Sequence, residues 1–268
     1  MTALLQIFFF VLGLTIGSFL NVIVARYHTA RSFSGRSICM SCNKKLCWYE
    51  LIPLVSFLAL RGRCFACKTR ISKFYPLVEF FTGLLFLTLF LKFENLFWLD
   101  FPNFALTYSY YAFLFSVLII IAVYDLKHKI IPDLLSFTLF LVSFAGIFFI
   151  APEGNTYIFD PRLPGLLELV SGLIVASPFA LFWLVSKGEW MGLGDAKLAV
   201  GLGYMLGLNK AFSALVLSFW FGAVLGILLV ALTRKYGMKS ELPFAPFLVF
   251  ASLFAFIFEI YLFPFFSF

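Results

Sequence analysis

Long apolar runs separated by short charged loops are the feature that most limits how this chain can fold. Seven runs approach or exceed the length of about twenty residues that a helix needs to cross a bilayer, and an eighth run is shorter. The long runs are 3–24, 74–91, 105–124, 134–150, 166–185, 211–232 and 244–263, and the short run is 196–208. We therefore expect an all-α polytopic membrane protein with about eight transmembrane helices.

The composition supports a lipid environment. Only 12% of the 268 residues are charged and 63% are hydrophobic, whereas a soluble domain carries about 25% charged residues. The net charge of +7 can indicate a nucleic-acid partner. Here the basic residues lie in the loops between apolar runs, which indicates membrane orientation, so we expect a lipid bilayer and no nucleic acid as a partner.

The distribution of lysine and arginine predicts the topology. Residues 25–73 contain ten of them and a single acid, Glu50. If the loops at 125–133, 186–197 and 233–242 lie on the same side, that side holds seventeen of the twenty basic residues. Because cytoplasmic loops are enriched in Lys and Arg, we place these segments in the cytoplasm and both termini outside.

Three parts follow from this topology. Residues 1–24 form a first transmembrane helix, which we expect to be retained because no basic segment precedes it and no small-residue cleavage site follows it. Residues 25–73 form a cytoplasmic cysteine-rich loop, and residues 74–268 form the remaining transmembrane core.

Two C-x-x-C pairs predict how the loop folds. Cys39 and Cys42 form the first pair, Cys64 and Cys67 form the second, and 21 residues separate the pairs. This spacing is typical of a zinc ribbon, in which four thiolates surround one ion. The alternatives are disulfides, which a reducing cytoplasm disfavours, and unligated thiols. A fifth cysteine, Cys47, is either a spectator or a substitute ligand.

Two aspartates at the ends of apolar runs are candidate catalytic groups. Asp125 follows the run 105–124, and Asp195 precedes the short run, just after Gly192 and Gly194. Ionisable residues at membrane depth are costly and usually functional. Two carboxylates held close together cannot both ionise easily, so one keeps a proton. Such a pair supplies a base and an acid around one water molecule, as in aspartic proteases.

Each aspartate also has a structural explanation. Asp195 can cap the helix that follows it, and Asp125 can pair with Lys129 one turn further on. The two glycines before Asp195 leave room for an extended substrate chain. Because both acids share one side of the membrane and one depth, we favour the functional interpretation.

Other polar and small residues indicate structural roles. Glu50 and Glu79 are expected to be ion-paired anchors, with Arg70 or Lys73 as the partner of Glu79. Small residues at every fourth position predict close helix packing. For the short run this predicts burial within the bundle. The small residues are Gly13 and Gly17, Gly222 and Gly226, and Ala199, Gly203 and Gly207.

Six motifs, in order along almost the whole chain, resemble the bacterial type IV prepilin peptidases. They are GSFLNVIVARY at 17–27, the cysteine loop at 35–72, YPLVEFFTG at 75–83, DLKHKIIPD at 125–133, GLGDAKLAVGLG at 192–203 and PFAPFL at 243–248. Two small departures occur. The family usually has a proline shortly after the position of Arg26, and it favours one where this chain has Met40.

The resemblance implies an intramembrane aspartic endopeptidase of the GxGD type, with Asp125 and Asp195 as its catalytic pair and the four paired cysteines as zinc ligands. It implies that the substrates are prepilin and pseudopilin precursors, cut at the cytoplasmic face of the bacterial inner membrane. It also implies N-methylation of the new terminus with S-adenosylmethionine as the methyl donor. No residue that binds this donor is identified from the sequence.

Three other functions are considered. A presenilin-like protease without methylation keeps the aspartate pair, but the cysteine loop and GSFLNV argue against it. An ion or proton transporter uses paired acids as a relay, yet coupling acids usually lie near mid-bilayer, often in related halves, and no internal repeat is visible. A zinc-ribbon binding module on a membrane anchor needs far fewer than eight crossings.

Overall fold

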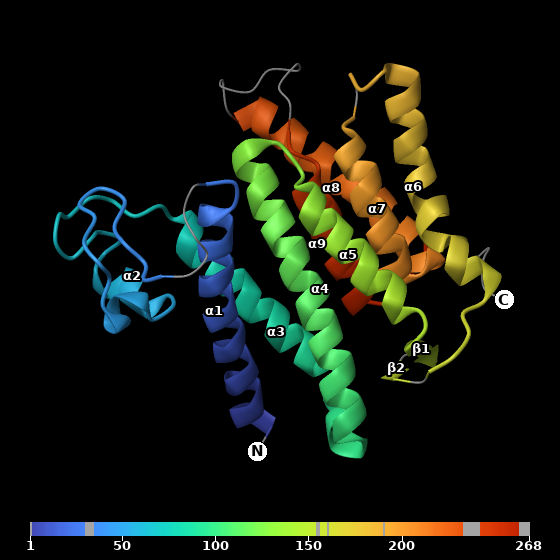
Figure 1. Ribbon diagram of the computed structural model, residues 1–268, viewed down its shortest axis with the longest axis horizontal. Helices are drawn as coiled ribbons and strands as arrows, with labels where there is room; N and C mark the ends of the chain where they lie inside the picture. The colour runs from blue at the N-terminus through green and yellow to red at the C-terminus, as the bar shows by residue number, and fades with distance from the viewer. Residues whose placement is uncertain are drawn as a thin grey trace. The chain divides into compact units, whose positions relative to one another are not determined.

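The computed structural model describes residues 2–29, 35–153, 156–159, 161–189, 191–232 and 242–262 (Figure 1). The chain divides into two compact units, Met1–Asn95 (unit 1) and Leu96–Phe268 (unit 2). Each unit is described by itself below. The basic stretch 233–241, which the topology prediction places in the cytoplasm, lies outside the described residues.

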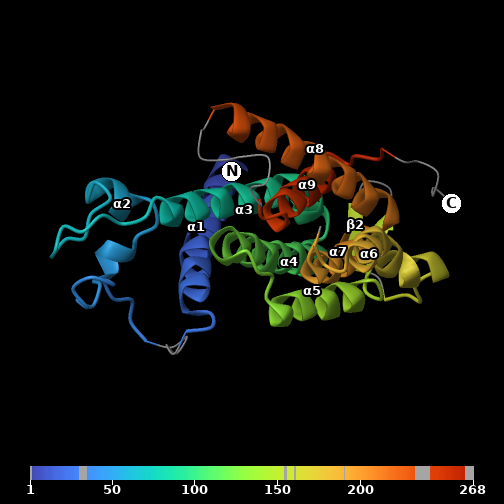
Figure 2. The ribbon, with the colours of Figure 1, turned by 90° about the horizontal axis from the view of Figure 1, so that it is seen from above.

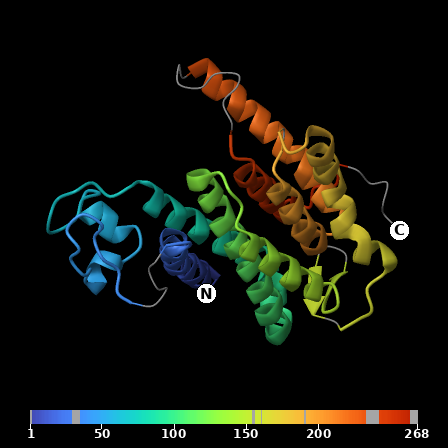
Figure 3. The same ribbon diagram turned by 45° about the horizontal axis from the view of Figure 1, so that its top comes forward.

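Unit 1 contains two long helices and the cysteine loop between them. Its elements are α1 (Thr2–Arg26), the 3-10 helix η1 (Trp48–Leu51), the short α2 (Val55–Ala59) and most of α3 (Phe74–Leu99). Helix α1 packs across α3 (Figure 3). A Cβ atom on Gly13 would lie 2.7 Å from the carbonyl oxygen of Thr82. The small residue therefore allows the two backbones to touch, as its spacing predicted.

Unit 2 is a helical bundle with one short β-hairpin. Its elements are α4 (Phe101–His128), α5 (Asp133–Gly146), β1 (Ile150–Glu153), β2 (Thr156–Phe159), α6 (Leu166–Ser186), α7 (Leu193–Leu206), α8 (Leu208–Leu232) and α9 (Ala245–Ile257). The strands pair antiparallel, with Ile150 opposite Phe159. Helix α7 packs against α5, α6, α8 and α9, and Figure 2 shows α9 between α4 and α8.

Helix α7 is the most enclosed part of unit 2, as the sequence predicted. Ten of its fourteen residues are buried. A Cβ atom on Gly203 would lie 2.6 Å from the Cα atom of Gly172 on α6, so only glycine permits this approach. Gly222 differs, because a Cβ atom there would meet only the Phe247 ring at an ordinary 3.7 Å. Close packing through Gly222 is therefore not observed.

The predicted helices are present in every apolar run. Among the described residues, five helices are long and apolar enough to cross a membrane, namely α1, α3, α4, α6 and α8. The other three, α5, α7 and α9, have 14, 14 and 13 residues, so their crossing remains a prediction. The hairpin was not expected. Helix α5 ends at Gly146, before the end of the predicted run 134–150, and the hairpin begins at Ile150, the last residue of that run.

Candidate functional site

Asp125 lies in the last turn of α4 and is held by the start of α9. Only 5% of the residue is exposed, and its carboxylate accepts a hydrogen bond of 3.2 Å from the backbone N–H of Ala245. The first N–H groups of a helix have no partner within the helix, so Ala245 has a free donor for this carboxylate. Lys129 was considered as an alternative partner, but the carboxylate is held by the backbone of α9 instead.

The end of α4 fixes where this carboxylate lies. Lys129 adopts a left-handed conformation and donates its backbone N–H to the carbonyl oxygen of Asp125 at 2.7 Å, which closes the last turn. Three residues later Pro132 is the N-cap of α5. Proline has no N–H and disfavours the helical conformation for the residue before it. The chain therefore turns directly after the last turn of α4, which contains Asp125.

Asp195 lies in the first turn of α7. It is the third residue of the helix, and Gly192 is the N-cap, so the capping role considered from the sequence is wrong. The residue is 9% exposed, and no hydrogen-bond donor reaches its carboxylate among the described residues. The positive end of the helix dipole favours a negative charge at this position.

The structure brings the two aspartates within range of each other's charge. They are 70 residues apart in the sequence, yet the charge of Asp125 acts directly on the carboxyl group of Asp195. Near Gly192, a Cβ atom would meet only the backbone nitrogen of Gly194 at 3.9 Å and Oδ2 of Asp195 at 4.0 Å. The turn at Gly192 therefore lies directly beside the Asp195 carboxylate.

The four paired cysteines lie together in unit 1. Their Sγ atoms are all within 4.8 Å of one another, and those of Cys39 and Cys67 are 3.8 Å apart. A tetrahedral zinc ion with bonds of about 2.3 Å holds its sulfur ligands about 3.8 Å apart. The donor set is therefore compatible with zinc. Cys47 lies outside this cluster, at the start of η1.

The two cysteine pairs sit in equivalent backbone turns. In each turn the first cysteine donates its N–H to a carbonyl five residues later, and its own carbonyl accepts from the residue four positions on. The bonds are Cys39 to Lys44 at 3.0 Å, Asn43 to Cys39 at 2.9 Å, Cys64 to Thr69 at 2.9 Å and Lys68 to Cys64 at 3.0 Å. Asn43 and Lys68 both have positive φ, 55° and 58°. The loop thus contains two turns of the same geometry, and each turn carries two of the four clustered cysteines.

Glu50 is an ion-paired anchor of the loop, as expected. Its carboxylate lies 3.2 Å from Nζ of Lys44 and accepts a hydrogen bond of 2.8 Å from the backbone N–H of Cys47. The hydrogen bond from Cys47, followed by the interaction with Lys44, lowers the pKa of Glu50 below its ordinary value.

Glu79 is held differently from the sequence prediction. Its carboxylate accepts a hydrogen bond of 2.9 Å from the backbone N–H of Leu54 and another from the side chain of Ser18. The expected ion pair with Arg70 or Lys73 is wrong. Leu54 has a positive φ of 59°, which is uncommon for a leucine, so this carboxylate secures a strained point of the loop.

Comparison with known proteins identifies the family. The model of the bacterial Peptidase A24 N-terminal domain matches residues 11–93, and that of the type IV leader peptidase family matches residues 112–227. A protein named prepilin leader peptidase/N-methyltransferase from Myxococcus xanthus is 37% identical over 89% of this chain and 67% of its own length. The chain belongs to the type IV leader peptidase family. Other members of the same name come from Pseudomonas aeruginosa, 33% identical over 90% of this chain and 86% of its own length, and from Bacillus subtilis, 31% identical over 93% and 92%.

The two matched regions of this leader peptidase contain the two clusters described above. The first covers the four clustered cysteines, and the second covers Asp125 and Asp195. No solved structure matches the chain. Sequence reasoning missed the contribution of Ala245, because a backbone N–H leaves no mark on residue type. The nearest signal was the motif PFAPFL, whose prolines at 243 and 246 surround it.

Proposed function

We propose that this leader peptidase is an intramembrane aspartic endopeptidase with Asp125 and Asp195 as its catalytic pair. Its substrates are type IV prepilins and pseudopilins, from which it removes a short basic leader. The observation that carries the proposal is that two buried carboxylates from separate helices lie within range of each other's charge, beside the turn at Gly192. The related prepilin leader peptidases of Myxococcus xanthus and Pseudomonas aeruginosa support the substrate class.

In the proposed reaction one aspartate is ionised and the other is protonated. The ionised carboxylate takes a proton from a water molecule, and the water oxygen attacks the carbonyl carbon of the peptide bond. The carboxylic acid gives its proton to the carbonyl oxygen, which produces a gem-diol. The proton taken from water then passes to the leaving nitrogen as the C–N bond breaks, and one gem-diol hydroxyl returns its proton to the other carboxylate. The pair ends with one proton between its two carboxylates, as it began, and no covalent intermediate is formed.

The membrane orients the substrate in this proposal. A basic leader stays in the cytoplasm for the same reason as the basic loops of this chain, and the apolar segment that follows it enters the bilayer beside the enzyme. We propose that α5, α7 and α9 also cross or enter the membrane, which gives eight crossings in a bacterial inner membrane. Asp125 and Asp195 then face the cytoplasmic side, where the leader begins.

We further propose that the cysteine loop, residues 25–73, holds one structural zinc ion through Cys39, Cys42, Cys64 and Cys67. Together with the names of the relatives, the intact loop supports a second activity, N-methylation of the new terminus. S-adenosylmethionine, when bound, supplies an electrophilic methyl group. The new terminal amine of the substrate would lose a proton to solvent and accept this methyl group.

Conservative substitutions test the aspartate pair. Asp125→Asn and Asp195→Asn keep side-chain shape and remove the acid, so each should abolish leader removal by the purified enzyme while the protein still accumulates. Asp133→Asn is the matched control, because Asp133 is exposed on α5 and pairs with Lys197 at 2.6 Å. Substantial cleavage by either Asp125→Asn or Asp195→Asn would rule out the pair as catalytic groups.

A further inference from the structure

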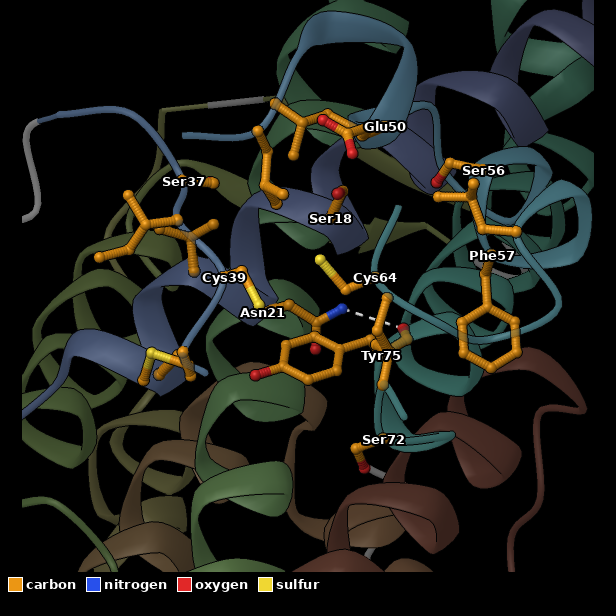
Figure 4. Close-up of a pocket in the computed structure, with 18 of the residues that line it drawn as sticks. Ser18, Asn21, Ser37, Cys39, Glu50, Ser56, Phe57, Cys64, Ser72 and Tyr75 are labelled. Carbon is orange, nitrogen blue, oxygen red and sulfur yellow. Dashed lines mark hydrogen bonds between the residues drawn. The ribbon is translucent and has the colours of Figure 1, made fainter. Parts of the chain in front are cut away.

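Each unit contains a cavity, and the wall of the unit 2 cavity has open polar atoms. The unit 1 cavity is bounded by the end of α1, the start of α3 and the cysteine loop (Figure 4). The unit 2 cavity has a volume of about 330 Å³, within the range of roughly 300–1,000 Å³ that is usual for small-molecule sites. Among the described residues, two buried side-chain atoms have no hydrogen-bond partner, Nε of Arg162 and Oδ1 of Asn209, and both residues line the unit 2 cavity. Buried polar atoms almost always have partners, so this pair points to a ligand.

The unit 2 cavity lies away from the aspartate pair. It is lined by Leu206 at the end of α7, whereas Asp195 lies in the first turn of that helix. The two positions are about 17 Å apart along a helix that rises about 1.5 Å per residue. Leu167 and Asn209, at the starts of α6 and α8, also line the cavity. The proposed peptide hydrolysis therefore does not use it, and the proposed topology places it at the outer surface of the membrane.

The lining of the unit 2 cavity is typical of a boundary between membrane and water. Tyrosine is enriched where a bilayer meets water, and four tyrosines line the cavity, namely Tyr110, Tyr111, Tyr204 and Tyr261. Leu167 also lines it and is 46% exposed, so this part of the rim faces the surroundings of the bundle. A lipid at this depth can place its headgroup in the cavity while its acyl chains stay in the bilayer.

The described charged residues favour a ligand that has an anionic group but no net charge. Arg162 and Lys210 line the cavity together with one carboxylate, Glu168. Arg162 pairs with Glu168 through Nη2 at 2.6 Å, and Lys210 pairs with Glu259. These four charges balance one another. The Nε–H of Arg162 that is left over is a donor on a cation, and such donors bind phosphate oxygens strongly.

The side-chain oxygen of Asn209 adds the requirement for a donor on the ligand. An amide oxygen only accepts hydrogen bonds, so a ligand that satisfies both open atoms presents an acceptor to Arg162 and a donor to Asn209. A phosphodiester beside a primary ammonium group meets both conditions and has no net charge. We propose that the unit 2 cavity binds the headgroup of a phospholipid of this kind, phosphatidylethanolamine, with its phosphate on Arg162 and its ammonium group on Asn209. The bound lipid links the segment before α6 to the start of α8.

Retention of lipid by the purified full-length protein in detergent tests the proposal, and native mass spectrometry counts the bound molecules. Phosphatidylethanolamine and phosphatidylcholine with identical acyl chains are added in equal amounts. They differ only in that the ammonium group of phosphatidylcholine carries three methyl groups and no N–H. Phosphatidylethanolamine should be retained about 10-fold more, the factor expected for one hydrogen bond. Equal retention, or retention of neither lipid, would overturn the proposal and leave the two open atoms to water.

Two substitutions test the two contacts separately. Asn209→Leu keeps the size of the side chain and removes the acceptor, so retention of phosphatidylethanolamine should fall to that of phosphatidylcholine, which should not change. Arg162→Lys keeps a positive charge near Glu168 and removes Nε–H, so retention of phosphatidylethanolamine should fall about 10-fold. Equal loss of both lipids in Asn209→Leu, or an unchanged Arg162→Lys variant, would contradict the assignment. Ser177→Ala is the control, because Ser177 is exposed on α6 and bonds within its own helix.

A third variant covers the case in which these substitutions disturb the fold. Leu167→Trp enlarges a half-exposed side chain at the rim and leaves Arg162 and Asn209 intact, so it should abolish the preference for phosphatidylethanolamine. If the preference persists, the lipid binds elsewhere and the cavity assignment is wrong.

A soluble headgroup separates the two sources of this chemistry. Glycerophosphoethanolamine has the same headgroup without acyl chains and should not be retained by the parent protein. If it is retained as well as the lipid, the ligand is a soluble phosphoester and the lipid assignment is overturned. These measurements need neither leader cleavage nor methylation, so their failure leaves the proposed function unaffected.

Discussion

The carboxylate of Asp125 accepts a hydrogen bond from the backbone N–H of Ala245, across 120 residues of sequence. This contact joins the last turn of α4 to the first turn of α9. It gives the motif PFAPFL a physical role, since the motif starts a helix whose free N–H groups point at a buried acid. Three elements, α4, α7 and α9, therefore set the position of the proposed catalytic pair.

Removing the Ala245 donor should slow cleavage. Ala245→Pro deletes the N–H at the first position of α9, where no hydrogen bond within the helix is lost. A hydrogen bond to a charged group contributes about 1.5–3 kcal/mol, so the cleavage rate should fall roughly 10- to 100-fold. Ala245→Gly keeps the donor and should stay close to the parent rate. Equal rates for the two variants would mean that this bond does not support the reaction.

Enlarging Gly203 should separate α7 from α6. The new methyl group of Gly203→Ala would meet the Gly172 backbone, which cannot move without shifting a helix. Overpacking of this kind costs about 1–3 kcal/mol, and it should lower both thermal stability and cleavage because α7 carries Asp195. Gly222→Ala is the matched control and should be neutral. A neutral Gly203→Ala in thermal inactivation assays would argue against this close approach.

The cysteine cluster should hold one metal ion per chain. Elemental analysis of freshly reduced protein should give about one zinc, and Cys39→Ser should lose it because three thiolates bind zinc less tightly than four. Cys47→Ser should keep the full content, since Cys47 lies outside the cluster. A metal-free parent protein would favour unligated thiols. Loss of zinc in Cys47→Ser would show that the ligand set is misassigned.

Glu50 should stabilise the folded cysteine loop by the same free energy throughout the neutral pH range. Its pKa is lowered in the folded loop, so its stabilising effect is complete above the unfolded value of about 4.3. The effect is lost only as the pH falls through the lower folded-state value. Glu50→Gln should therefore release zinc to a chelator faster than the parent, by a ratio that is unchanged from pH 5 to pH 8.

A variant of the neighbouring charge Lys45 is the control for the zinc-release measurement. Lys45→Met removes a basic residue beside Lys44 that has no ion pair with Glu50, and it should leave zinc release near the parent rate. A ratio that instead rises or falls steeply between pH 5 and pH 8 would show that another titrating group controls the loop.

The helices could be predicted from the sequence because lipid leaves few alternatives. In a bilayer every backbone polar group must bond within the protein, so each apolar run forms a helix, and all eight did so. The hairpin at Ile150–Phe159 could not be found in this way. It lies beyond the end of α5, where the two strands satisfy each other's backbone groups and apolar length no longer decides the structure.

The polar contacts were harder to predict because residue type indicates charge but not backbone geometry. Lys129 was a reasonable partner for Asp125, and Arg70 or Lys73 for Glu79, yet both carboxylates bind backbone N–H groups. One of these groups lies at a helix start and the other at a strained turn. Such donors exist only after the chain has folded. The cysteine cluster was easier, because the repeated spacing of Cys39, Cys42, Cys64 and Cys67 is itself the geometric signal.

The shortness of α5, α7 and α9 has a consequence for water supply. Fourteen helical residues span about 21 Å, while the hydrocarbon layer is about 30 Å thick. If α5 and α9 cross as proposed above, the membrane beside them must thin or let its polar surface dip inward. Asp125 lies in the last turn of α4 and Asp195 in the first turn of α7, so with the proposed crossings the thinned layer would leave both acids close to the aqueous side, and the hydrolase would need no long channel for its second reactant.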